Sequence, residues 1–449
     1  MKKISVLFSI LLFTSVWATS GYSQILPQGI GAVYLGSRQY SSGTPYYDAS
    51  GNPTTLSERF DMNFSGEFLK SGKAGTDLKS LYDNLRAYES SKGGQDHTMA
   101  DDLQLGVQKA QVDMKFDAKV FGLGYGLNKK WTLLLGVPIM SASIAADINV
   151  TGYNNALVIK NRLGDAAFDE LKDGLDKASQ INRMTILSKI QDEYRYKDIS
   201  YWEYTGIGDI LIGGRTAWDY QFQNKPSYSL QLTSYLSLPT GPKYDPDALA
   251  QIPVSRGFAA LDVTSDHKFK WDMFTLGSEL GGAIGLPQKT VRRVPVGNEV
   301  LVTPDRKTEV MWSPGPETWV SAYAAIGPSA YQAQYKLGMN EDFPDKFSGP
   351  IEGAYDIMGK ENSSQEIYHQ LIFNLSTVDY YNSQKFFMPF ILTLTAHETI
   401  AGRAILGKRY VELTFMTFFK TPAHRESNES LQSSGTGLAA NGQSKRRAK

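Results

Sequence analysis

One short run restricts the fold of this chain more than any other feature. Residues 109–120 alternate without a break between polar and apolar side chains, ending Lys115-Phe116-Asp117-Ala118-Lys119-Val120. Side chains alternate between faces only in an extended strand, so the run predicts a β-strand with one apolar and one charged face. A soluble sandwich would turn the apolar face into its core. A membrane barrel would turn it toward lipid, and the rest of the chain must decide.

The N-terminal segment has the composition of an export signal. Lys2 and Lys3 precede an apolar stretch, residues 4–18, which is followed by small and polar residues. We therefore expect residues 1–23 to be a secretory signal that is removed on maturation. The apolar stretch is shorter than the roughly 20 residues that a spanning helix needs. No later window approaches a spanning helix, so helical membrane proteins are excluded.

The composition fits a membrane barrel. Mean hydropathy is only -0.31, but every second residue of a barrel strand faces away from lipid, so barrels keep a low average. The 41 Gly, 25 Tyr and 21 Phe suit sharp turns and aromatic girdles. The absence of cysteine excludes disulfides and thiol chemistry. A formal net charge of zero gives no reason to expect a nucleic-acid partner.

Short and long connections alternate between the candidate strands. The segments with strand character are residues 29–39, 105–127, 131–150, 206–222, 228–238, 258–269, 273–286, 317–326, 330–337, 365–377, 385–395 and 407–419. Short turns on one side and long loops on the other are typical of bacterial outer-membrane barrels. The sequence therefore predicts an all-β fold, a transmembrane antiparallel up-and-down barrel of about twelve strands. If residues 59–69 also span, the barrel has fourteen.

Aromatic residues recur beside the predicted short turns, where amphipathic rings suit a membrane interface. They are Tyr125, Trp131, Trp218, Tyr220, Phe222, Tyr380, Tyr381, Phe386 and Phe387. The long loops contain helical patterns at residues 76–94 and 164–192, the first with Thr76 as a candidate cap. These helices either form a lid or plug over the barrel mouth, or decorate the outer rim.

Three glycine-based motifs carry a family resemblance. They are Leu-Gly-Tyr-Gly-Leu-Asn-Lys-Lys-Trp-Thr-Leu-Leu-Leu-Gly-Val-Pro at residues 123–138, Gly-Ile-Gly-Asp at 206–209 and Ser-Leu-Pro-Thr-Gly at 237–241. Across roughly residues 105–286 the chain resembles the outer-membrane proteins named for the meta-pathway of phenol degradation. The resemblance implies an outer-membrane barrel related in style to transporters of fatty acids and aromatic hydrocarbons. The helical insert and the C-terminus depart from that pattern.

The C-terminal strand ends in aromatic residues and resembles the signal by which barrels are assembled, with Phe419 as its closing residue. We therefore expect the barrel to occupy residues 24–420 and to meet the barrel-assembly machinery. Residues 421–449 are polar, lack periodicity and end in a basic cluster. They predict a disordered periplasmic tail.

Charged side chains on predicted strands are the candidates for the barrel lumen. If the apolar face of residues 109–120 meets lipid, the opposite face points inward, and the same argument applies to the strand that begins near Gly206. The lumen candidates are Lys109, Asp113, Lys115, Asp117, Lys119, Asp209 and Arg215. Charges on one lumen wall either pair across strands or create a field that selects solutes. About twelve strands predict a narrow or obstructed passage.

Catalytic signals are weak. His97, His267, His369, His397 and His424 are scattered, without a metal-binding pair or a nucleophile signature. We expect no enzyme, no catalytic residue, no metal and no cofactor. The expected function is a channel or transporter for small hydrophobic or aromatic compounds in the outer membrane of a Gram-negative bacterium. The alternative is a non-transporting barrel that binds partners through its outer loops. Outer-membrane lipid and lipopolysaccharide are the expected surroundings.

Overall fold

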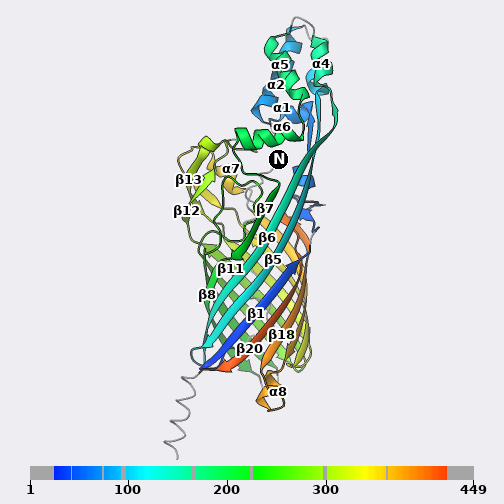
Figure 1. The fold of residues 1–449 in the computed structure, drawn as a ribbon. Helices are drawn as coiled ribbons and strands as arrows, with labels where there is room; N and C mark the ends of the chain where they lie inside the picture. Colours follow the sequence, from blue (N-terminus) through cyan, green and yellow to red (C-terminus); the bar gives the residue numbers. More distant parts are fainter. Residues whose placement is uncertain are drawn as a thin grey trace, which may run out of the picture.

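The computed structural model describes residues 25–421 apart from residues 42, 73–74, 93–97, 164–166, 223–225, 297–300 and 361–362. The predicted signal, residues 1–23, lies outside the described residues, as does the predicted tail after residue 421. The described chain forms a tall closed barrel with a helical extension at one end (Figure 1). None of its helices is both long and apolar enough to cross a membrane.

Twelve antiparallel strands close the barrel. The main sheet has fourteen strands, but β4 (Met62–Ser65) and β7 (Tyr201–Ile207) lie at its ends and only flank β5 and β6. The ring closes because β1 pairs with both β5 and β20. The barrel strands are β1 (Ile30–Tyr40), β5 (Gln104–Gly126), β6 (Trp131–Asn154), β8 (Ile210–Gln221), β9 (Ser227–Leu238), β10 (Ala260–Trp271), β11 (Phe274–Gly285), β14 (Glu317–Ile326), β15 (Tyr331–Asp342), β17 (Ser364–Ser376), β18 (Phe390–Arg403) and β20 (Arg409–Lys420).

The prediction of an all-β barrel of twelve strands is confirmed. The fourteen-strand alternative is wrong, because residues 59–69 do not span. They supply only the short strand β4, which pairs with β5, and then enter helix α1 (Gly66–Lys70). The Ser65 hydroxyl accepts a hydrogen bond from the Phe68 amide and caps this helix. The strand therefore ends at Ser65, where the helix begins.

The connections differ at the two ends of the barrel. At the short-turn end, tight turns join β5 to β6, β10 to β11 and β14 to β15, only a few residues separate β8 from β9, and a turn with helix α8 (Val378–Asn382) joins β17 to β18. At the other end, the long-loop end, the connections carry all remaining helices and small sheets. One sheet contains β12 (Gln288–Arg293), β13 (Lys307–Ser313) and β16 (Lys346–Ser348), beside helix α7 (Tyr355–Lys360); a second contains β2 (Tyr46–Tyr47), β3 (Pro53–Thr54) and β19 (Ile405–Leu406).

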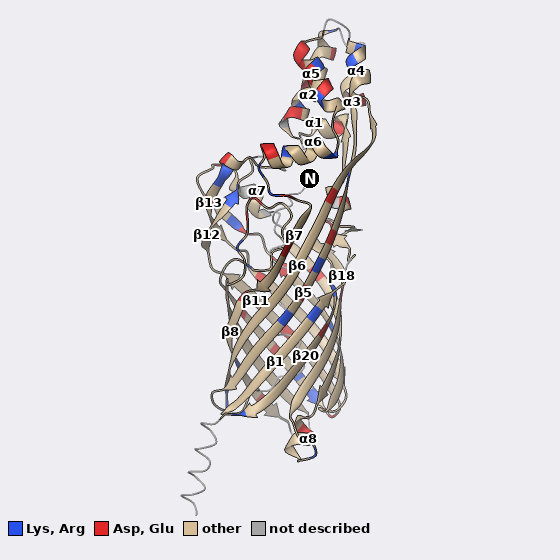
Figure 2. Cartoon of the chain, viewed as in Figure 1, with Lys and Arg blue, Asp and Glu red and all other residues tan. Residues whose placement is uncertain are grey.

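Large apolar side chains cover the outer wall of the barrel. We call this surface the apolar belt and define it by exposed residues on β1, β5, β6, β8, β9, β11, β17 and β20: Leu35, Phe121, Leu123, Leu133, Ile212, Leu236, Leu276, Leu371, Phe373 and Leu413. The aromatic residues predicted beside the short turns are all exposed there. Charged positions gather in the upper strands and the loops (Figure 2). A wall this apolar is unusual for a protein surface in water.

The helices of the long loops pack together at the open end of the β5–β6 hairpin, where β5 begins and β6 ends; this end rises beyond the other strands (Figure 1). They are α1, α2 (Thr76–Ser91), α3 (Met99–Asp102), α4 (Ala156–Leu163), α5 (Asp169–Ser179) and α6 (Arg183–Ser188). Leu85, Leu103, Ile159 and Leu175 are among the fully buried side chains of their common core. We call this unit the helical cap. Both predicted helical regions contribute to it, through α2, α5 and α6, and α1, α3 and α4 are additions. Thr76 is the first residue of α2 and not its cap.

Candidate functional site

The barrel encloses a lumen lined by polar side chains. The inward positions along the strands are buried and carry hydroxyl, amide and charged groups, including Thr132, Arg215, Gln231, Thr233, Thr275, Gln370, Thr393 and Thr414. Buried polar groups need hydrogen-bond partners, because an unpaired group has lost its water without compensation. The lumen chemistry is therefore determined by how these groups pair.

One buried ion pair joins the first and last barrel strands. Arg38 on β1 and Glu412 on β20 lie opposite each other in the strand register, and both are almost completely buried. The Arg38 Nε and Nη2 donate to Glu412 Oε2 at 2.9 and 2.5 Å. The guanidinium also lies 4.3 Å from the ring centroid of Tyr410. This pair ties the two ends of the sheet together from the inside.

Further pairs reach past an intervening strand. Lys336 Nζ on β15 donates to Glu279 Oε2 on β11 at 2.9 Å, with β14 between the two strands. Similarly, the Tyr323 hydroxyl on β14 donates to Asp266 Oδ1 on β10 at 2.8 Å. These long side chains occupy space on the inner side of the barrel, where Lys336 and Glu279 are almost completely buried.

Glu366 on β17 is the centre of a larger network and is fully buried. Its Oε1 accepts a bond from the Thr399 hydroxyl at 2.6 Å and lies 3.2 Å from His397 Nε2. Its Oε2 accepts bonds from Lys408 Nζ at 2.8 Å and Asn340 Nδ2 at 2.9 Å. The His397 ring stacks on Tyr410, which also lies beneath Arg38. The two networks are therefore continuous.

A second charged cluster lies at the long-loop end. Arg256 is 2% exposed, yet it forms ion pairs with Asp262 on β10 at 2.9 Å and with Glu317 on β14 at 3.1 Å. These two carboxylates compensate the desolvation of the guanidinium. Arg256 ends the loop 239–256, so the pairs fix this loop to the barrel wall.

The three glycine-based motifs meet beside this cluster. Gly208 donates its amide to the Pro138 carbonyl at 2.9 Å. The Thr240 hydroxyl donates to the Gly208 carbonyl at 2.7 Å and accepts from the Ile210 amide at 3.0 Å. A Cβ on Gly241 would lie 2.7 Å from Ser255 Cβ, so only glycine permits this approach. The motifs thus have a structural role: they hold loop 239–256 against the barrel.

Asp209 completes that junction. Its carboxylate is fully buried and accepts bonds from the Ser255 hydroxyl at 2.6 Å, the Arg256 amide at 2.7 Å and the Gly241 amide at 3.2 Å. Burial raises the pKa of Asp209 above its ordinary value, and the three donors oppose that rise by favouring the charged form. Asp209 therefore anchors loop 239–256 and presents no free charge to a solute.

Loop 239–256 folds inward over the barrel mouth. Its residues Ile252 and Val254 are buried against the inner face of the β5–β6 hairpin, where they contact a cluster that includes Phe116, Met140 and Ile144. We call this surface the apolar mouth wall. The part of the mouth that this hairpin surrounds is therefore apolar on its inside, in contrast to the polar lumen below it.

The structure places five lumen candidates on the opposite face from the one expected. Lys109, Asp113, Lys115, Asp117 and Lys119 are all exposed, and strand alternation puts them on the same side of β5 as the outward residues of the apolar belt. The apolar residues between them face inward. The physical reason is that loop 239–256 packs Ile252 and Val254 against the inside of this part of β5, so the apolar side chains face inward there.

The other two lumen candidates are buried on the inner side. Asp209 lies in the junction described above, and Arg215 on β8 donates from Nε to the Thr233 hydroxyl at 3.2 Å on β9. The sequence analysis did not select Arg38, Glu366 or Glu412. A signal exists for such residues: Glu412 stands between Val411 and Leu413, so one charge occupies the inward position between two outward apolar side chains.

The described histidines serve local contacts. His267 Nδ1 lies 2.8 Å from the Tyr228 hydroxyl, and His369 lies 3.5 Å from Glu398 on the outer face. His97 and His424 lie outside the described residues. Within the described ranges no group of three or more His, Asp or Glu side chains has the geometry to hold a metal.

Comparison with known proteins adds little beyond the fold. No family model and no curated protein matches the chain, so the phenol-degradation family is not confirmed. Solved structures that match include a channel described as "CymD monoaromatic hydrocarbon channel", with 9% identity and a TM-score of 0.27, covering 88% of this chain and 90% of that one. The toluene transporters TodX of Pseudomonas putida and TbuX of Ralstonia pickettii have 6% and 8% identity and TM-scores of 0.26 and 0.27, each covering 88% of this chain and 90% of its own. Similarity at this level carries no argument about function.

Proposed function

We propose that the chain is an outer-membrane barrel that passes small hydrophobic or aromatic compounds. The apolar belt supports the membrane location, because exposed apolar side chains carry no free-energy penalty when they contact the hydrocarbon of a bilayer. The segregation of short turns from long loops supports an orientation with the short-turn end in the periplasm. The barrel acts as a passage and not as an enzyme.

The apolar mouth wall is the observation that carries the transport proposal. A pore for ions or sugars lines its entrance with polar groups, whereas Phe116, Met140 and Ile144 make this entrance apolar. A small apolar solute gains free energy there by leaving water. Loop 239–256 covers the wall with Ile252 and Val254, so the passage is closed in this conformation and opens when the loop moves.

The experiment compares the natural chain with Ile252→Asp, which places a charge on the covered apolar wall. Uptake of a radiolabelled aromatic compound is measured in Gram-negative cells with intact lipopolysaccharide, and current is measured across planar bilayers. We expect uptake above that of cells without the protein, little current, and a rise of both in Ile252→Asp. No uptake and no current in either protein would contradict transport.

A second function is favoured by a different observation. Ion pairs such as Arg38–Glu412 and Lys336–Glu279 lie buried on the inner side of the barrel, and the helical cap presents a large structured surface beyond the barrel. A structural or surface-interaction barrel would have both features. Under this alternative the purified protein retains no aromatic solute, and Ile252→Asp changes only the accessibility of the loop to protease.

A further inference from the structure

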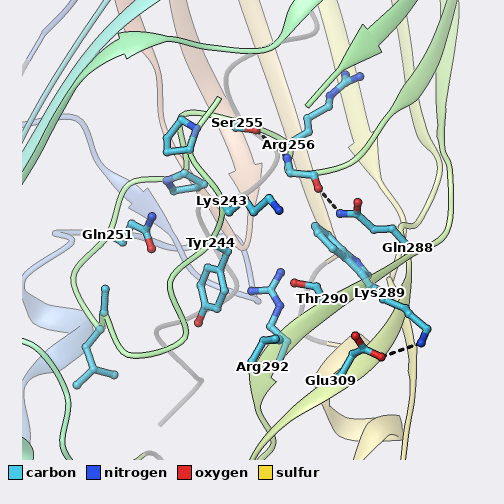
Figure 3. A pocket seen from close by; sticks show the side chains of 17 residues that line it. Lys243, Tyr244, Gln251, Ser255, Arg256, Gln288, Lys289, Thr290, Arg292 and Glu309 are labelled. Carbon is cyan, nitrogen blue, oxygen red and sulfur yellow. Dashed lines mark hydrogen bonds and ion pairs between the residues drawn. The ribbon is translucent and has the colours of Figure 1, made fainter. Parts of the chain in front are cut away.

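A cavity of about 270 Å³ lies at the long-loop end of the barrel. Loop 239–256 forms one side, and the β12–β13 hairpin forms the other (Figure 3). A cavity of about 150 Å³ already holds benzene, and drug-sized ligands need roughly 300 Å³ or more. The available space therefore suits a compact molecule with one ring or a short branched chain.

Arg292 on β12 points into this cavity (Figure 3). The residue is only 6% exposed, and its guanidinium carbon lies 3.8 Å from the ring centroid of Tyr244 and 4.9 Å from that of Trp312. Among the described residues no carboxylate forms an ion pair with it, and its Nε has no hydrogen-bond partner. Burial lowers the pKa of Arg292, and attraction to Tyr244, a hydrogen bond with that side chain and the charge of Asp345 oppose the shift more weakly.

Arg293, the next residue on β12, is a useful comparison because its charge is fully paired within the protein. Arg293 forms an ion pair with Asp247 at 2.7 Å and donates to the carbonyl of Val302 at 2.7 Å and of Arg195 at 2.9 Å. Its charge is therefore compensated within the protein. Among the described residues Arg292 has only Tyr244 and the ring of Trp312 as partners and no carboxylate. A buried guanidinium without a counter-charge is costly, so a bound anion would supply what Arg292 lacks.

A second unused donor lies beside the first. Trp312 lines the cavity, and its Nε1 is buried without a hydrogen-bond partner. Lys243, at the exposed rim, has no ion-pair partner among the described residues and adds positive charge, whereas Lys289 is paired with Glu309 at 2.8 Å. The remaining wall includes apolar side chains of Leu249, Pro253 and Val291.

We propose that this cavity binds a small organic carboxylate with a compact apolar body, such as a single ring. The planar guanidinium of Arg292 donates to the carboxylate oxygens, and Trp312 Nε1, which is buried without a partner, donates once a small side-chain movement opens it to the cavity. The ring packs between Tyr244 and the apolar wall. The inference goes beyond the proposed passage and does not rest on it, because binding here requires no movement through the lumen.

The test uses the purified full-length protein in detergent micelles and measures heats of binding for four probes. We expect saturable benzoate binding, comparable binding of cyclohexanecarboxylate, and at least tenfold weaker binding of toluene and of inorganic phosphate. Equal binding of toluene would show a merely apolar cavity, and equal binding of phosphate would show a general anion site. Either result overturns the proposal, as does the absence of benzoate binding.

Variants assign the binding to the named donors. Arg292→Gln is expected to weaken benzoate binding at least tenfold, and Lys115→Gln, which removes a remote exposed charge from β5, leaves it unchanged. Trp312→Phe retains the ring but removes Nε1, so it weakens benzoate binding several-fold without changing toluene binding. If Arg292→Gln does not fold, Trp312→Phe decides, and unchanged benzoate binding in it overturns the proposed pair of donors. These binding results do not depend on transport, so they would stand even if the natural chain transported no solute.

Discussion

The lower and upper parts of strand β5 have opposite hydrophobic faces. In the lower part the outward residues Phe121, Leu123 and Tyr125 are apolar and exposed, while glycines occupy the inward positions between them. In the upper part the outward residues Lys115, Asp117 and Lys119 are charged, and the inward residues are apolar. One continuous strand thus changes its pattern between Lys119 and Phe121.

This difference teaches that a strand's surroundings determine its pattern. Under the proposed location, lipid lies outside the lower part and a polar lumen lies inside it. Water lies outside the upper part, and the folded loop fills the inside with Ile252 and Val254. An alternating run shows that a strand has two unlike faces but not which of them meets lipid.

The largest expected effect concerns the buried ion pair inside the barrel. Arg38→Met leaves Glu412 charged and buried without its partner, so we expect a loss of about 3–5 kcal/mol in the free energy of unfolding. The double variant Arg38→Met/Glu412→Leu is expected to recover most of that loss. Urea unfolding in micelles measures both. Equal destabilisation by the single and double variants would contradict the account of a polar lumen held by pairing.

The next effect tests the outer wall of the barrel. Leu371→Arg places a charge in the apolar belt, and the expected cost in a lipid bilayer is about 2–4 kcal/mol. Asp117→Arg on the upper outward face of β5 is the matched control and is expected to change stability little. Unfolding of both variants at the same urea concentration in lipid vesicles would contradict the claim that Leu371 faces lipid and Asp117 faces water.

A smaller effect is expected at the junction between the regions. Asp209→Asn removes an acceptor from the Ser255, Arg256 and Gly241 donors, at a cost of about 1–3 kcal/mol. Because burial raises the pKa of Asp209 in the folded state, its contribution is fully present below the unfolded pKa and is lost as pH rises through the folded value. Melting of the two proteins across pH 3 to 8 checks this: the stability gap narrows with rising pH. A constant gap would contradict a raised pKa.

The smallest effect concerns an exposed ion pair. Arg409 Nε donates to Glu398 Oε1 at 3.0 Å on the outer face, and both side chains are largely solvated. Glu398→Gln is expected to cost less than about 1 kcal/mol, because solvent and salt screen such a pair. The free energy of unfolding of Glu398→Gln is measured in the same micelles as that of Arg38→Met. A loss of several kcal/mol in Glu398→Gln would show that this face is not exposed to water.

Most of the barrel could be predicted from the sequence. Strand β14 begins and ends at the predicted residues, and the other eleven differ mainly at their ends. The alternation of short and long connections gave the strand number, because each hairpin leaves a turn signal in the local sequence. The expected aromatic residues beside the short turns are also exposed.

The residues that line the lumen could be predicted only in part. Which face of a strand points inward depends on what lies on both sides of that strand. Lys115 was assigned to the inside on the assumption that all of β5 meets lipid. Glu366 pairs with His397 and Lys408, which lie on or beside other strands, so no local pattern marks the network. Arg292, which has no carboxylate partner among the described residues, is likewise recognisable only once Tyr244 and Trp312 surround it.

The most direct test of the central claim uses the lack of cysteine in the chain. Single cysteines at Leu123, Leu371, Lys115 and Lys119 are exposed to a membrane-impermeant maleimide in sealed lipid vesicles, and again after unfolding. The account predicts rapid labelling of Lys115→Cys and Lys119→Cys, labelling of Leu123→Cys and Leu371→Cys only after unfolding, and a boundary between positions 119 and 123. Equal labelling of all four in intact vesicles would contradict a belt that faces lipid.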